Sequence, residues 1–219
     1  MSRVKYVFVS LLPAIVCAAA LPETSNSDAA NRSDRALSVL IRTKTTSATY
    51  ARYAWNKITP PDKATTEGWS AEFNDGPMHR VETPRDRLIA NCVERSGAAY
   101  SVSTGQTFSG PGVAGTACGI NTNKQITSIR YVGRVVDRVG EADRVEVTDA
   151  DNIRTYDVTR DGILIRTVFA LNTPEKPIVL DEETVAVLRE LPRQNMFDAT
   201  SLSQSVVPDA YKKPPAIWP

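Results

Sequence analysis

The histidine and cysteine residues have the most distinctive chemistry in this 219-residue chain, which has one histidine and three cysteines. His79, flanked by Arg80 and Glu82, has the side chain of a general base. A lone histidine in an alternating segment is nevertheless typical of an exposed strand position. We therefore predict no catalytic residue, and catalysis by His79 in a small exported hydrolase or accessory protein is the alternative hypothesis.

Two further segments resemble ligand-binding loops but lack their essential residues. The segment Ser109-Gly110-Pro111-Gly112 has no G-K-[ST] sequence of a phosphate-binding loop. The segment Asp149-Ala150-Asp151-Asn152 begins like a calcium loop, but Arg160 stands where a bidentate glutamate belongs. We predict a hairpin turn at 149–152, and no metal or cofactor.

The charges are nearly balanced, with 26 Lys and Arg against 25 Asp and Glu. Nothing in this balance favours a phosphate backbone, so nucleic acid is excluded as a partner. The segment 80–87 reads Arg-Val-Glu-Thr-Pro-Arg-Asp-Arg and alternates in charge. Such a segment is typical of a solvated edge.

The N-terminus has the three parts of a secretory signal. Arg3 and Lys5 precede an apolar segment at 6–16, and Ala18-Ala19-Ala20 follows. We predict a signal peptide at 1–20, cleaved near Ala20, and an exported, soluble, periplasmic protein with no transmembrane anchor after its removal. A buried N-terminal helix and a lipid anchor on Cys17 are the alternatives.

Removal of the signal leaves two cysteines, Cys92 and Cys118, in an oxidising compartment. One disulfide between them is the expected pairing. It would close a loop of about 25 residues and stabilise the fold by roughly 3 kcal/mol. A redox-active pair is the alternative, but it would need a much closer spacing.

Periodicity and turn residues predict an α+β domain. A helix is expected over 29–43, with Ser33 as its N-cap and Leu37, Leu40 and Ile41 on its buried face. The expected strands are 45–58, 69–73, 78–82, 87–93, 98–103, 125–139, 144–148, 154–159 and 163–171. A long loop is expected at 105–119 and a late short helix at 182–191. Together these make a curved antiparallel sheet, a half-barrel of about eight strands.

The domain organisation follows from composition. After the signal we predict a flexible N-terminus at 21–32, a single half-barrel-like domain at 33–206 and a Pro-rich C-terminal tail at 207–219. Prolines should keep the tail extended. Because a free tryptophan is costly to leave in water, we expect Trp218 to dock on this domain or on an envelope protein partner.

Several segments, in this order, resemble a known superfamily. The sequence pieces are Tyr50 after the leading helix, Ala71-Glu72-Phe73, Gly76, His79-Arg80-Val81-Glu82, Arg154-Thr155-Tyr156-Asp157-Val158 and Asp161-Gly162-Ile163-Leu164-Ile165-Arg166. This pattern, over about residues 33–170, is similar to the periplasmic lipoprotein-carrier (outer-membrane lipoprotein-sorting, LolA-like) superfamily. The resemblance implies an open half-barrel whose apolar concave face suits an acyl chain, a lipoprotein or a hydrophobic peptide, without catalysis.

A curved sheet offers one face for a core or for a ligand cavity. The candidate ligand-binding residues on that face are Tyr50, Trp69, Phe73, Leu88, Ile129, Tyr131, Val135, Ile163 and Ile165. The alternative is that these residues only fill a core, as any half-buried sheet requires. The resulting hypothesis is an exported binding protein for an apolar ligand, with lipid or lipoprotein as possible partners, or else a protein-interaction module of the envelope.

Overall fold

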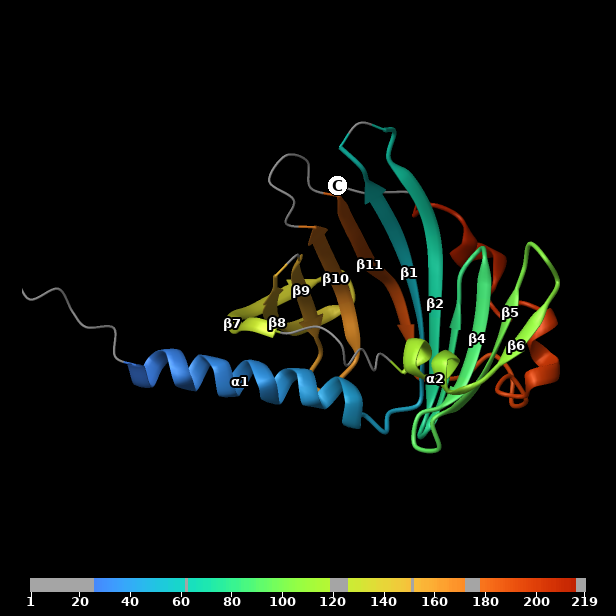
Figure 1. The fold of residues 1–219 in the computed structure, drawn as a ribbon, viewed down its shortest axis with the longest axis horizontal. Coiled ribbons are helices and arrows are strands. Elements are labelled where there is room, and N and C mark those ends of the chain that lie inside the picture. The colour runs from blue at the N-terminus through green and yellow to red at the C-terminus, as the bar shows by residue number, and fades with distance from the viewer. Residues whose placement is uncertain (1–25, 62, 119–125, 151, 172–177, 216–219) are drawn as a thin grey trace, which may run out of the picture.

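The computed structural model describes residues 26–61, 63–118, 126–150, 152–171 and 178–215. It confirms an α+β fold built on one large, curved and unclosed antiparallel sheet (Figure 1). Eleven strands form this sheet, in the order β6-β5-β4-β3-β2-β1-β11-β10-β9-β8-β7. The predicted signal peptide, residues 21–25 and Trp218 lie outside the described residues.

The helices and strands have the following bounds. The sheet contains β1 (Tyr50–Thr59), β2 (Thr66–Asp75), β3 (Met78–Glu82), β4 (Asp86–Asn91), β5 (Ser96–Ser101), β6 (Thr107–Ser109), β7 (Ile126–Asp137), β8 (Gly140–Asp149), β9 (Asn152–Val158), β10 (Leu164–Leu171) and β11 (Val179–Leu188). The helices are α1 (Asn26–Thr45), α2 (Pro111–Ala117) and the 3-10 turns η1 (Ala199–Ser203) and η2 (Asp209–Lys212). The described strands outnumber the nine predicted strand segments because β6 and β11 lie in segments predicted as loop and helix.

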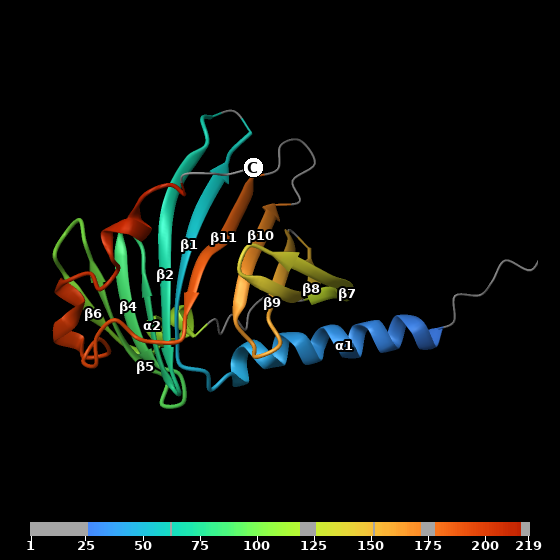
Figure 2. The ribbon, with the colours of Figure 1, turned by 180° about the vertical axis from the view of Figure 1, so that it is seen from behind.

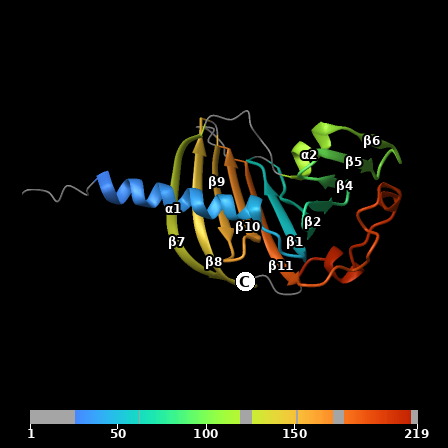
Figure 3. The ribbon, with the colours of Figure 1, turned by 90° about the horizontal axis from the view of Figure 1, so that it is seen from below.

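Both α-helices pack on the same face of the sheet, which we call the helical face. The helix α1 lies across β7, β8 and β9 and buries Ala36 and Val39 there (Figure 3). The predicted buried residues Leu37 and Ile41 are instead about half exposed, at 47% and 49%. Two faces of α1 carry apolar residues, so the periodicity of the sequence alone did not determine which face of the helix packs on the sheet. Among the helices in the described part of the chain, none combines the length and the apolar composition of a membrane-spanning segment.

The start of the chain is more helical than predicted. Residues 26–28, which precede the predicted helix at 29–43, also belong to α1, and Ser33 is inside the helix rather than at its N-cap. The same helix continues to Thr45, so β1 begins at Tyr50 and not at residue 45. Ala30 and Ala36 are strong helix formers, and their propensity outweighs the polar composition of this region.

The predicted loop at 105–119 contains β6 and α2. Pro111 is suited to the first turn of a helix, and Ala114 and Ala117 bury against β4 and β5 on the helical face. The expected disulfide is confirmed: Cys92 and Cys118 are joined, with their Cα atoms 5.6 Å apart. It fastens the end of α2 to the turn between β4 and β5.

Residues 195–212, which we call the strap, cover the opposite face of the sheet over β1–β5 (Figure 2). The fully buried Arg80 side chain holds the strap through backbone oxygens. Its guanidinium donates to the carbonyl oxygens of Met196 and Gln204, and to the Ser201 hydroxyl at 2.7 Å. The irregular strap thereby gains partners for backbone groups that have no ladder to join.

Glu82 completes this contact and is also fully buried. It accepts hydrogen bonds from Arg80 Nε at 2.7 Å, from the Ser205 hydroxyl at 2.6 Å and from the Val206 amide at 3.1 Å. The prediction of a solvated edge at 80–87 is therefore wrong for these two residues. Arg80 and Glu82 are far from the strap in sequence but contact it in the folded protein, and the strap excludes water from both side chains.

The tail is not simply extended. Asp209–Lys212 form a 3-10 turn, and Val207 is buried in the core of this side. The ring of Tyr211 stacks on Tyr53, with centroids 4.0 Å apart and planes 5° from parallel. An aromatic anchor close to the C-terminus therefore does dock on the domain, at a position that the sequence analysis had not identified.

The predicted late helix at 182–191 is wrong. The segment forms β11, which lies between β1 and β10 near the middle of the sheet. Val179, Val185 and Val187 are β-branched and favour a strand. Over so short a segment, apolar residues at 185, 187 and 188 fit both the helical period of 3.6 and the strand period of 2. Pairing with β1 and β10 makes the segment a strand.

The strap does not reach the far half of the opposite face, and charged side chains cover it. Arg144 donates both Nε and an NH2 group to Asp157, each at 2.7 Å. Arg166 makes a similar bidentate contact with Asp181 on β11. These pairs cross neighbouring strands, so they stabilise strand pairing on a face exposed to water.

We expect Arg80→Met to lower the free energy of unfolding by about 3–5 kcal/mol, because it removes the nearest cation of the buried Glu82 carboxylate and leaves only Arg87 Nε, 3.8 Å away. Urea denaturation measures this loss. The exposed Arg85 provides the control, since Arg85→Met should stay within about 0.5 kcal/mol of the parent. Equal stability of the two variants would contradict the role assigned to Arg80.

We expect the paired variant Cys92→Ser with Cys118→Ser to lose roughly 3 kcal/mol of stability through the freed loop. Thiol titration of the unfolded, unreduced parent protein without the 1–20 segment should find no free thiol. Two reactive thiols in that titration would refute the disulfide.

Candidate functional site

The structure divides the nine predicted ligand-binding residues between the two faces of the sheet. Trp69 and Phe73 lie on the opposite face, against the core under the strap. The others are associated with the helical face, in three groups. Leu88 lies under α2; Ile129 and Tyr131 lie near α1; and Tyr50, Val135, Ile163 and Ile165 share one further cluster. The nine residues therefore do not line one common surface.

Between α1 and α2 the helical face carries a network of polar side chains. Arg52, only 4% exposed, lies at its centre. Its guanidinium donates to the Thr184 hydroxyl at 2.7 Å and to the carboxylates of Glu72 and Glu182. The Ser70 hydroxyl donates to the other Glu182 oxygen at 3.0 Å. The network joins β1, β2 and β11, so it stabilises the middle of the sheet, where neither helix packs.

Glu72 connects this network to the only histidine. The Tyr50 hydroxyl donates to its Oε1 atom at 2.6 Å, and His79 Nε2 lies 3.0 Å from the same atom. The histidine contact has the distance of an ion pair but not the alignment of a hydrogen bond. Burial acts to raise the pKa of Glu72, but His79, Arg52 and Tyr50 together outweigh it and lower the pKa to about 2.

The pKa of Tyr50 is shifted in the opposite direction, upward. Burial, followed by the charge of Glu72, raises the pKa of the Tyr50 hydroxyl well above its usual range. This group therefore stays a neutral hydrogen-bond donor at every physiological pH. The network presents an anchored carboxylate and a fixed donor, and their hydrogen-bonding capacity is used within the protein.

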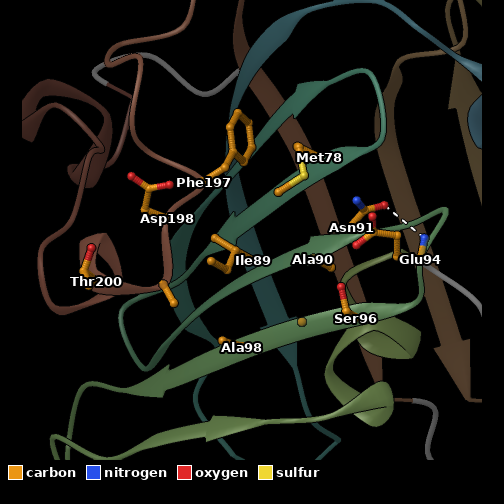
Figure 4. Close-up of a pocket in the computed structure, with 12 residues that line it drawn as sticks. Met78, Ile89, Ala90, Asn91, Glu94, Ser96, Ala98, Phe197, Asp198 and Thr200 are labelled. Atoms are coloured by element: carbon orange, nitrogen blue, oxygen red, sulfur yellow. Dashed lines mark hydrogen bonds between the residues drawn. The ribbon is translucent and has the colours of Figure 1, made fainter.

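An apolar groove of about 610 Å³ lies on the opposite face, between the ends of β3–β5 and the strap (Figure 4). Met78, Ile89 and Ala98 line it from the sheet, and Phe197 lies above them from the strap. Its rim is polar and includes Asn91, Glu94, Ser96, Asp198 and Thr200. The volume is within the ~300–1,000 Å³ range of ligand sites.

The backbone beneath the groove is already hydrogen-bonded. The strand β4 pairs with β3 on one side and β5 on the other, in continuous register. The Asn91 side chain accepts the amides of Val93 and Glu94 in the turn that follows β4. The groove therefore presents apolar side chains and saturated main-chain groups to a ligand.

The groove was missed from the sequence because half of it comes from the strap. Phe197 is about 100 residues from Ile89 and Ala98 in sequence, and no periodic pattern relates them. Its only local signal was the alternation of Met78, Arg80 and Glu82, which places all three on one face of β3.

The segment resembling a calcium loop is a turn, as predicted. Asp149 accepts from the Asn152 amide at 2.8 Å and pairs with Arg154 at 3.0 Å. The carboxylate thus closes the β8–β9 hairpin through side chains of its own segment.

We expect Glu72→Gln to lower stability near pH 7 by on the order of 3 kcal/mol, because the folded state favours the Glu72 carboxylate over its uncharged form. Since the folded pKa is lowered, this contribution is complete above the unfolded pKa near 4.5 and is lost as pH falls toward 2. Urea unfolding of both proteins from pH 7 to pH 2.5 should show the difference shrinking. The control Glu190→Gln, at an exposed position, should show little difference; a pH-independent gap for Glu72→Gln would contradict the analysis.

No protein-family model matches the sequence, and neither does any curated protein sequence. Solved structures show similarity at low identity. A LolA superfamily protein from Nitrosomonas europaea is 12% identical, with a TM-score of 0.40 over 74% of this chain and 97% of its own. An uncharacterised conserved protein from Thermus thermophilus is 14% identical, with a TM-score of 0.47 over 78% of this chain and 94% of its own.

The MucA/MucB complex of Pseudomonas aeruginosa also contains a similar chain, 10% identical, with a TM-score of 0.47. That match covers 75% of this chain and 61% of the other. At such identities the likeness concerns the fold alone. The Nitrosomonas europaea protein carries the name of the superfamily that the order of sequence segments resembles.

Proposed function

We propose that this protein is an exported, non-enzymatic binding protein whose groove between β3–β5 and the strap holds an acyl chain. The observation that carries the proposal is the 610 Å³ apolar groove with Met78, Ile89 and Ala98 in its wall. Burial of an apolar chain there gains roughly 25 cal/mol for each Å² removed from water.

An acyl chain suits the groove better than an extended peptide does. A peptide strand needs hydrogen-bond partners for its own amides and carbonyls once it leaves water. The strand β4 is paired with both of its neighbours, so it offers no free edge to a peptide strand. A hydrocarbon chain makes no such demand. The rim carries the carboxylates of Glu94 and Asp198 beside the uncharged Asn91, Ser96 and Thr200, so it suits a neutral ester group rather than a free carboxylate at the end of the chain.

Export is part of the proposal. The charged, apolar and Ala-rich parts of residues 1–20 support a cleaved signal. The Cys92–Cys118 disulfide supports an oxidising compartment such as the periplasm. A lipid or lipoprotein of the cell envelope is then the natural source of the acyl chain.

A fluorescent fatty-acid ester tests the proposal. We expect saturable binding to the protein without its 1–20 segment and displacement by an unlabelled fatty-acid ester. Ser96→Trp places a large ring in the groove and should weaken binding by about tenfold or more, because it removes buried apolar contact from the ligand. Titration of probe fluorescence measures both.

Two variants are matched controls. Thr107→Trp adds the same ring at an exposed strand position outside the groove lining and should leave the affinity unchanged. His79→Ala alters the helical face and should do the same, whereas a hydrolase centred on His79 would lose turnover. Absence of probe binding, or equal affinity in the Ser96→Trp and Thr107→Trp variants, would replace the acyl-binding proposal with a protein-interaction module.

A further inference from the structure

A second cavity, of about 360 Å³, lies at the other end of the sheet beside the C-terminal end of α1. Six residues line it: Arg42, Arg134, Glu141, Ala142, Asp143 and Arg160. Three arginines from α1, β7 and the β9–β10 turn therefore converge on one space. Opposing charge comes from two carboxylates, and their surroundings determine whether the cavity is electropositive.

The helix end and the β9–β10 turn are held tightly together (Figure 2). Gly162 in that turn has φ +88°, and a Cβ atom there would lie 2.5 Å from the Arg42 carbonyl oxygen. The Thr46 hydroxyl donates to the Asp161 carbonyl at 2.9 Å, and Arg42 NH1 donates to the Arg160 carbonyl at 3.3 Å. The walls of the cavity are thus built by close backbone contact that only glycine permits.

The negative charge of the Asp143 carboxylate is already balanced by neighbouring hydrogen-bond donors and cations. Arg42 donates to one of its oxygens at 2.6 Å and Tyr131 donates to the other at 2.8 Å, while Arg35 lies 3.8 Å away. Although burial opposes the change, these donors hold the pKa of Asp143 below its usual range. Asp143 therefore remains ionised but has little charge left to repel an anion.

The remaining cationic groups have unused donors. Among the described residues, the guanidinium groups of Arg134 and Arg160 make no ion pair or hydrogen bond, and Arg42 Nε is buried without a partner. Glu141 is exposed and lies at the β7–β8 hairpin. Two unpaired arginines then face one rim carboxylate, which leaves the cavity net positive.

We propose that this cavity binds an oxyanion, either a phosphate or a phosphate ester, between Arg134 and Arg160. Guanidinium groups present planar pairs of donors that match phosphate oxygens. A free phosphate and a lipid headgroup present the same oxyanion, so the chemistry recognised is the same for both. The site lies on the helical face beside α1, so it is separate from the apolar groove on the opposite face.

Calorimetric titration of the protein without its 1–20 segment with inorganic phosphate tests the site directly. We expect saturable binding, and a double variant, Arg134→Gln with Arg160→Gln, should weaken it by about tenfold or more through loss of charge-assisted bonds. The control is Arg85→Gln with Arg193→Gln, which removes the same net charge from exposed positions elsewhere. No saturable phosphate binding, or equal weakening in both double variants, would overturn the proposal.

A second arm distinguishes the source of the phosphate. Cosedimentation with phosphatidylcholine vesicles, with and without phosphatidylglycerol, is compared for the same proteins. If the parent protein binds the anionic vesicles and only the Arg134→Gln with Arg160→Gln variant loses this binding, the result supports a lipid headgroup. Phosphate binding without vesicle binding supports a soluble phosphate ester. Ser96→Trp should leave phosphate binding unchanged, so the acyl proposal and this one fail independently.

Discussion

The buried pair Arg80 and Glu82 is the interaction on which this side of the molecule depends. Two opposite charges two residues apart on one strand would gain little by their own attraction, since burial removes hydration from both. The strap provides what the pair lacks, because its carbonyls accept from Arg80 and its amide and hydroxyl donate to Glu82. The pair in turn gives an irregular segment a defined position. The buried ion pair and the strap therefore depend on each other, because each supplies hydrogen-bond partners that the other would lack away from water.

The two faces of the sheet are covered by different elements. On the helical face, α1 and α2 pack on the two ends, and the network around Arg52 occupies the middle, where no helix packs. On the opposite face the strap covers β1–β5, and cross-strand arginine–carboxylate pairs such as Arg144–Asp157 cover the rest. Where helices and strap do not reach, polar pairs such as Arg52–Glu182 and Arg144–Asp157 join neighbouring strands.

Sequence patterns predicted the parts of this fold that depend on local rules. The strand at 78–82 was predicted with its observed bounds, and the Cys92–Cys118 pairing followed from counting thiols. The failures at β11, at Arg80 and at the groove have a common cause, which is that distant segments decide the outcome. β11 is a strand because β1 and β10 pair with it, and Arg80 is buried because the strap folds back over it. The groove could not be predicted for the same reason, since its upper wall is Phe197.

The anchoring of the strap also constrains how the groove can respond to a ligand. Arg80 binds the carbonyl of Met196 on one side of Phe197 and the Ser201 and Gln204 oxygens on the other. Residues 197–200, which contribute the upper wall, are therefore an arch held at both ends. The floor contains β4, which is paired on both sides and does not move without breaking ladder bonds. Adjustment is then concentrated in the arch, and a mostly preformed groove lowers the ordering cost of binding.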